Sequence, residues 1–208
     1  GEISAPGYVC KPINLGANTD PYQPAEREHR TTRQLLEVLL AHRHPVTIVT
    51  KGALILRDLD LLADLASRHL VSVVVSLTTL DDELKRALEP RAASPRARLR
   101  AISGLAAAGV PVTVMMAPVI PALNDHEIEA ILSAARSAGA REAGYVLLLL
   151  PLELKELSRE WLAAEVPDRA HRVLHVLQSM HGGRDYVAAF GVRQRGRGPY
   201  AEQIAQRF

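Results

Sequence analysis

The sequence alternates between short apolar runs and longer stretches with helical periodicity. The runs are rich in Val, Ile and Leu and cover residues 12–17, 46–50, 71–77, 110–117 and 144–150. Strand-length runs that are almost continuously apolar are typical of strands buried on both faces, as in a parallel sheet covered by helices. The alternation therefore predicts an α/β fold: a barrel, part of a barrel or a doubly wound sheet.

The stretches between the runs predict the helices and some of their ends. The expected helices cover residues 25–42, 58–69, 81–88, 95–108, 124–138, 152–165, 168–181 and 200–208. Ser94 is expected to begin one helix and Gly109 to end it. Two other helices are expected to be capped at their N-termini, the helix over residues 58–69 by Asp58 and the helix over residues 124–138 by either Asn124 or Asp125. We expect one domain over residues 1–181, with residues 182–208 as an arginine-rich tail of the same domain.

The composition narrows the class of protein. A chain of 208 residues that is 48% hydrophobic can build a core without disulfides. Its one cysteine, Cys10, cannot form an internal disulfide or a thiolate metal site, and the eight histidines show no ligand spacing. We therefore expect no metal ligands in these residues and a reducing, cytoplasmic setting. A net charge of +2 is too small to indicate a nucleic-acid or membrane partner by itself, and no apolar run is long enough to span a membrane.

Polar side chains lie at or just after the ends of three apolar runs, at positions 18–20, 50–51, and 76 with 78–79. The corresponding positions of the fourth run are Met116 and Pro118. In parallel α/β folds the ligand site lies at the carboxyl ends of the strands, so these positions can line one pocket. They offer hydroxyls, a carboxylate and an ammonium, which suit a polar small molecule that carries a carboxylate or a phosphate.

Each of these side chains also has a simpler interpretation. Lys51 could hold an anion, form a Schiff base or be an exposed loop lysine. Asp20 could belong to the site or only begin a turn, because Asp-Pro favours turns. Ser76 could bond to its own backbone. The residues alone leave these alternatives open.

Five motifs occur in an order that resembles a known family. They are residues 15–24 (LGANTDPYQP), 48–51 (IVTK), 75–79 (VSLTT), 89–91 (EPR) with 94–95 (SP), and 117–125 (APVIPALND). Together they resemble the radical SAM superfamily, specifically its spore photoproduct lyase-like branch, which is also labelled DNA repair photolyase. The closing residues 198–202 and 204–208 are similar to the C-terminus of that branch. The resemblance covers nearly the whole chain.

The resemblance implies a fold, two cofactors and a set of cofactor-binding residues. The fold would be a partial (β/α)6 TIM-type barrel that lacks its first strand and carries C-terminal helices. The cofactors would be a [4Fe-4S] cluster and S-adenosylmethionine, and the implied reaction is lyase-like hydrogen abstraction by a 5′-deoxyadenosyl radical. By position, Lys51 and Ser76 would hold the methionine end of S-adenosylmethionine, and Thr19, with Asp20 beside it, and Arg98 would lie near it. An electron donor, a reductase or a flavodoxin-type protein, is also implied.

The sequence departs from the family in two places. The CxxxCxxC loop that supplies three thiolates is absent, so the resemblance implies cluster ligands upstream of Gly1 and a chain that is inactive by itself. Ala17 stands where spore photoproduct lyases place a hydrogen-donating cysteine, which argues against repair of thymine dimers by their mechanism. No catalytic residue and no substrate can be assigned from the motifs.

Two other functions remain open at this point. A barrel lyase could use Lys51 as a Schiff-base amine. Alternatively, a non-catalytic paralogue could bind nucleic acid through the arginines of residues 91–100 and of the tail, although these lack the interleaved aromatic residues that stack on single strands.

Overall fold

The computed structural model describes residues 3, 5–189 and 193–208, and its described residues contain one five-stranded parallel sheet. Residues 190–192 of the expected tail therefore lie outside the described residues. The strands are β1 (Ile13–Leu15), β2 (Val46–Thr50), β3 (Val71–Ser76), β4 (Val112–Val119) and β5 (Glu142–Leu147). Their spatial order follows the chain from β1 to β5. A doubly wound sheet reverses its strand order, so the sequential order favours a barrel or part of one. The predicted α/β class is confirmed.

Helices connect the strands, as the sequence predicted. They are α1 (Glu26–His29), α2 (Thr31–Ala41), α3 (Leu59–Ser67), α4 (Asp82–Leu88), α5 (Pro95–Ala107), α6 (Ile128–Ser137), α7 (Leu154–Glu165), α8 (Pro167–Met180) and α9 (Pro199–Arg207). Two 3-10 helices, η2 (Ala53–Asp58) and η3 (Asp125–Glu127), were not predicted. None of the described helices is long and apolar enough to cross a membrane.

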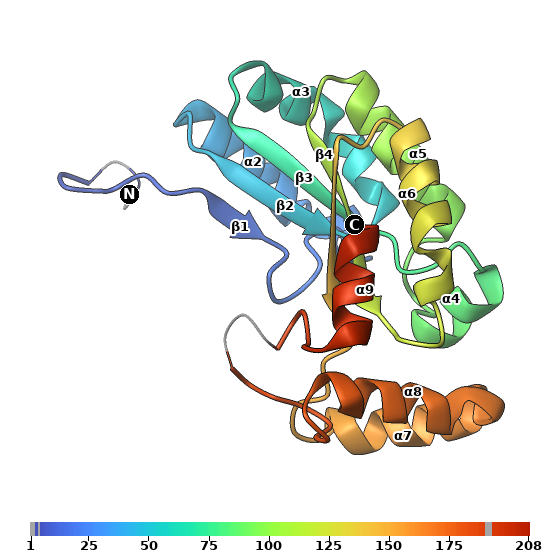
Figure 1. Cartoon of the computed structure of the whole chain (residues 1–208). Helices are drawn as coiled ribbons and strands as arrows, with labels where there is room; N and C mark the ends of the chain where they lie inside the picture. The colour runs from blue at the N-terminus through green and yellow to red at the C-terminus, as the bar shows by residue number, and fades with distance from the viewer. Residues whose placement is uncertain (1–2, 4, 190–192) are drawn as a thin grey trace. The chain divides into compact units, whose positions relative to one another are not determined.

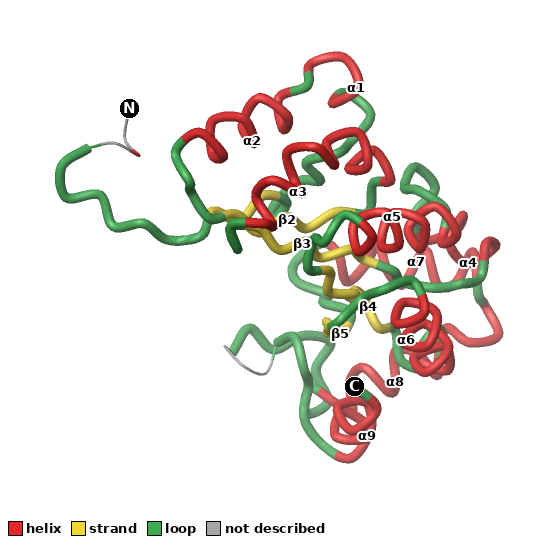
Figure 2. The backbone as a smooth tube through the Cα atoms, turned by 90° about the horizontal axis from the view of Figure 1, so that it is seen from above, coloured by secondary structure: helices red, strands yellow, loops and turns green. Residues whose placement is uncertain are grey.

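The chain forms two compact units. The first comprises Gly1–Leu77, Arg91–Val114 and Ala134–Glu142, and the second comprises Thr78–Pro90, Met115–Ser133 and Ala143–Phe208. In the first unit, α2 and α3 pack against each other along β2 and β3 (Figure 2). Side chains of α2, α3, β2 and β3 that are at most 3% exposed form its core: Leu36, Leu39, Val46, Ile48, Leu62, Leu65, Val73 and Val75.

The second unit contains the helical C-terminal part of the chain. In it, α7 and α8 run side by side (Figure 1) and bury Leu162, Val173 and Leu177. The C-terminal helix α9 is held at both ends, because Tyr200 donates to the Asp125 carboxylate and Arg207 bonds to Glu129. The short helix predicted at the end of the tail is therefore present and anchored.

The helix expected over residues 25–42 is wrong in one respect. It breaks at Arg30, which adopts a left-handed conformation with φ of 50°, and so forms α1 and α2. The Glu26 side chain accepts a hydrogen bond from the backbone N–H of Thr32 at 3.0 Å. In an uninterrupted helix that N–H would bond to a backbone carbonyl, so the buried Glu26 carboxylate replaces a helical hydrogen bond.

Two of the expected helix caps are also wrong. Asp58 precedes α3, but its side chain makes no capping bond, because its carboxylate pairs with arginines. Asn124 accepts from the N–H of Ile120, and neither Asn124 nor Asp125 caps α6, which begins at Ile128 after η3. The cap predicted for α5 is confirmed, since Ser94 accepts from the N–H of Ala97 at 3.3 Å.

Candidate functional site

The ends of β2 and β3 place two of the candidate residues next to each other. The strands are parallel, and Thr50 is paired with Val75. Lys51 and Ser76 are the next residues along their strands, so they occupy neighbouring positions at the carboxyl edge of the sheet. Ser76 is only 5% exposed, and within the described part of the chain its hydroxyl forms no hydrogen bond. A hydroxyl at this strand end that has no protein partner is available to a ligand.

Asp20 ties the loop after β1 to the end of β2. Its Oδ1 accepts from the N–H of Tyr22 at 2.9 Å and from the Thr50 hydroxyl at 2.7 Å. Its Oδ2 accepts from the backbone N–H of Lys51 at 2.7 Å. These three donors fix the backbone of Lys51 relative to the loop. The geometry therefore supports a positioning role for Asp20.

Two glycines allow the loop to lie against β2. A Cβ on Gly16, whose φ is 97°, would lie 2.1 Å from the Val49 carbonyl oxygen. A Cβ on Gly52 would lie 2.9 Å from both the Cβ and the carbonyl oxygen of Tyr22. Side chains at either position would push the loop away from the strand, so the site depends on both glycines.

A network of charged side chains anchors the loop after β1 through Tyr22. The Tyr22 hydroxyl donates to Asp58, which is fully buried, at 3.2 Å. Arg57 bonds to both Asp58 and Glu26, and Arg33 adds a further bond to Asp58. Burial opposes ionisation of Asp58 and Glu26 and is the largest single effect on the pKa of each. The hydrogen bonds and charge of Arg57, together with hydrogen bonds from Arg33 and Tyr22 to Asp58 and from backbone N–H groups to Glu26, outweigh it and hold the pKa of each carboxyl below its usual value. Burial and the neighbouring Asp58 raise the pKa of Tyr22 well above its usual value.

Arg98 connects the end of β3 to the loop before α5. It is 1% exposed, its Nη1 donates to the Ser76 carbonyl at 3.0 Å, and its Nε donates to the Ala93 carbonyl at 2.9 Å. Two backbone segments are thus fixed by one guanidinium. This arrangement makes Arg98 a residue that positions Ser76.

A cavity of about 400 Å³ opens beside the loop in the same unit. Asp20 and Lys51 line it together with two arginines, Arg27 and Arg91. Thr19 is exposed and lines a smaller neighbouring cavity of about 270 Å³, which Asp20 also lines. The structure thus brings Asp20 and Lys51 together in one cavity and joins Ser76 to Arg98.

Arg27 and Arg91 were not among the candidate residues. Arg91 belonged to the EPR motif at residues 89–91 and to an arginine cluster near the start of a helix, but it was assigned no ligand, and no pattern in the sequence distinguished Arg27. The short helix that carries Arg27 arises from the break at Arg30, which could not be predicted from periodicity. The tertiary fold is therefore what identifies Arg27.

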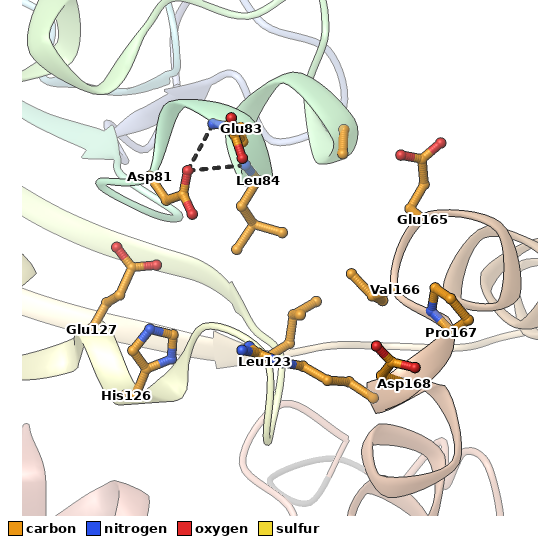
Figure 3. Close-up of a pocket in the computed structure, with 12 residues that line it drawn as sticks. Asp81, Glu83, Leu84, Leu123, His126, Glu127, Glu165, Val166, Pro167 and Asp168 are labelled. Atoms are coloured by element: carbon orange, nitrogen blue, oxygen red, sulfur yellow. Dashed lines mark hydrogen bonds between the residues drawn. The ribbon is translucent and has the colours of Figure 1, made fainter.

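A second cavity, of about 540 Å³, lies in the second unit and is rich in carboxylates (Figure 3). Two of these carboxylates accept hydrogen bonds from backbone N–H groups of their own unit. Asp81 caps α4 by accepting from the N–H groups of Glu83 and Leu84, as the dashed lines in Figure 3 show. Glu127 accepts from the Thr79 hydroxyl at 2.5 Å and from the N–H of Leu80 at 2.7 Å. The Thr79 hydroxyl, a strand-end candidate in the sequence, is thus used within its own unit.

Comparison with known proteins gives the family. The model of the radical SAM superfamily matches residues 2–135. Uncharacterised proteins of Mycobacterium bovis and Mycobacterium tuberculosis are each 37% identical over 172 residues, which is 82% of this chain and 49% of theirs. An uncharacterised protein of Methanocaldococcus jannaschii is 30% identical over 120 residues, 58% of this chain and 45% of its own. The chain thus spans about half the length of the curated relatives it matches. The chain belongs to the radical SAM superfamily.

Proposed function

We propose that this chain carries the S-adenosylmethionine-binding part of a radical SAM enzyme of the spore photoproduct lyase-like branch. The observation that carries the proposal is the pair of neighbouring strand ends: Lys51 follows one, and Ser76, whose hydroxyl has no partner among the described residues, ends the next. The methionine end of the cofactor presents a carboxylate, which favours an ammonium and a hydroxyl donor. Hydrogen bonds between such charged partners are among the stronger ones in proteins.

The other candidate residues fit this proposal in supporting roles. Asp20 fixes the backbone of Lys51, and Arg98 fixes the backbone of Ser76. Both act as positioning residues, because their polar atoms are engaged by the protein. Thr19 is exposed beside the loop and is proposed as a further contact to the cofactor. When bound and reduced by one electron, the cofactor supplies hydrogen abstraction from a substrate.

The residues present do not fit a [4Fe-4S] cluster. The family holds its cluster with three thiolates, and this sequence has one cysteine, Cys10, which is exposed. Among the described residues, no group of three His, Cys, Asp or Glu side chains could hold a metal ion. We therefore assign the cluster ligands to a polypeptide segment outside these 208 residues, and the electron donor to a separate reductase or flavodoxin-type protein.

The charged tail gives little support to the nucleic-acid alternative. Arg195 lies over the Tyr145 ring at 4.2 Å, and Arg207 is paired with Glu129. These two cations are engaged within their own unit and are less available to a phosphate backbone.

Binding of S-adenosylmethionine to the purified chain tests the proposal. Isothermal titration calorimetry should show binding to the wild type, and Lys51→Ala and Ser76→Ala should each weaken it by about tenfold or more, because each loses a hydrogen bond to a charged group. Lys11→Ala, which removes an exposed lysine, is the matched control and should bind like the wild type. Unchanged binding in Lys51→Ala, or no binding by the folded wild type, would contradict the proposal. Borohydride trapping of a carbonyl compound on Lys51 would instead support the Schiff-base lyase.

A further inference from the structure

Two guanidinium groups of the first unit lie at the same cavity. Arg27 on α1 and Arg91 in the loop before α5 both line the cavity of about 400 Å³. Both residues are exposed, and neither side chain forms a hydrogen bond or an ion pair with a described residue. Arg33 and Arg57 of this unit are each paired with carboxylates, whereas Arg96 and Arg100 are exposed and form no ion pair with a described residue. What distinguishes Arg27 and Arg91 is that both line the cavity.

The carboxylate of the cavity does not neutralise these two arginines. Asp20 already accepts three hydrogen bonds, from Tyr22, Thr50 and Lys51. Two like charges that face one concave surface raise its potential and attract an anion. The cavity is therefore built for a negatively charged ligand.

The proposed cofactor is a poor match for both arginines. S-adenosylmethionine carries one carboxylate, for which Lys51 and Ser76 are proposed, and it also carries an ammonium and a sulfonium. Two additional guanidinium groups would repel those cations. The charge of Arg27 and Arg91 is better suited to a second, anionic molecule.

We infer that Arg27 and Arg91 bind the phosphate group of a small phosphate-ester substrate. Calling this molecule the substrate rests on the proposed function; its binding does not. A guanidinium presents paired N–H groups that match phosphate oxygens, and two guanidinium groups can hold one phosphate from both sides. Tyr22, Leu54 and Ala92 line the same cavity and offer apolar contact to the rest of the ligand. A volume of about 400 Å³ lies within the range of small-molecule pockets.

A small molecule fits this surface better than a polynucleotide. The formal net charge of the chain is +2, far from the broad positive footprint that polynucleotide binding requires. The two arginines converge on one cavity, so they can hold one phosphate group more readily than a row of them.

Calorimetric titration with phenyl phosphate and with inorganic phosphate tests the inference. The wild type should bind both. Arg27→Ala and Arg91→Ala should each weaken binding by about tenfold, and the double variant should lose it. Arg100→Ala removes an exposed arginine outside the cavity and should bind like the wild type. Circular dichroism should show unchanged melting for all variants, because the side chains removed are exposed and form no hydrogen bond or ion pair with a described residue.

The same variants separate this inference from the proposed function. Arg27→Ala and Arg91→Ala should bind S-adenosylmethionine as the wild type does, whereas Lys51→Ala should not. Phosphate binding without cofactor binding would refute the proposed function and leave the phosphate site standing. Loss of cofactor binding in Arg27→Ala and Arg91→Ala would assign them to the cofactor and overturn the inference. Tighter binding of a single-stranded oligonucleotide than of phenyl phosphate, lost in the same variants, would also overturn it.

Discussion

Asp20 shows how a single carboxylate can join a loop to the end of a neighbouring strand. Both of its oxygens accept hydrogen bonds, and the donors come from its own loop and from the end of β2. The sequence left open whether Asp20 belongs to a turn or to a site. In the structure it closes the turn at Tyr22 and also accepts from the backbone N–H of Lys51, and its place in a ligand site stays a prediction. Hydrogen-bond partners 30 and 31 residues away along the chain could not be predicted from a turn motif.

We expect Asp20→Asn to destabilise the protein and to weaken cofactor binding together. The amide would turn an N–H group toward one of the three donors and leave that donor without an acceptor, which costs about 1–3 kcal/mol. Denaturant unfolding would measure the free energy, and titration with S-adenosylmethionine would measure the affinity. Asp64→Asn on α3, an exposed position, is the control. Unchanged binding of the cofactor by a destabilised Asp20→Asn would restrict Asp20 to stability.

At the scale of elements, the apolar periodicity predicts the strands and most helices but misplaces the ends that charged groups determine. The strands β2 and β3 agree closely with expectation because their fully buried positions are occupied mainly by Val and Ile, which made the runs visible in the sequence. The break at Arg30 and the missing cap at Asp58 share one cause, the network of Glu26, Arg57 and Asp58. Glu26 lies in α1, whereas Arg57 and Asp58 lie in η2. The residues next to each of them along the chain do not indicate that these side chains are in contact.

The network predicts a loss of stability in acid. The folded-state pKa values of Glu26 and Asp58 lie below their usual values, so these groups stabilise the fold above the pKa of the unfolded chain, near pH 4. That contribution is lost as the pH falls through the lower folded-state values. Urea unfolding at a series of pH values from 7 to about 3 would measure it.

Removing Arg57 isolates the contribution of the network. Arg57→Met leaves the buried carboxylates of Glu26 and Asp58 without their main partner and should cost about 3–5 kcal/mol at neutral pH. The folded-state carboxyl pKa values should rise toward or above those of the unfolded chain, so the variant should lose less stability than the wild type as the pH falls below about 4. Arg68→Met removes an exposed ion pair with Asp64 and should cost at most about 1 kcal/mol. Equal pH profiles in the wild type and Arg57→Met would show that the network does not control acid stability.

At the scale of the whole molecule, the order of the elements was predictable and the grouping of the chain was not. Five alternating runs predicted a parallel sheet, and the sequential strand order favours the barrel-type arrangement among the alternatives. The two compact units each combine segments that are distant along the chain, such as residues 1–77 with 91–114. Local periodicity carries no information about such contacts. The same limit applies to Arg27 and Arg91, which converge on one cavity from segments 64 residues apart.

The last prediction concerns iron binding by these 208 residues, which contain a single cysteine. Anaerobic treatment of the chain with iron and sulfide should leave it without bound iron and without charge-transfer absorption, because Cys10 alone cannot replace three thiolates. Iron analysis and absorption spectroscopy after desalting would measure this, with Cys10→Ser as the matched control. Binding of S-adenosylmethionine to the same iron-free sample should persist through Lys51 and Ser76. A stable, stoichiometric cluster in the wild type would contradict the assignment of its ligands to another segment, and loss of that cluster in Cys10→Ser would identify Cys10 as one of its ligands.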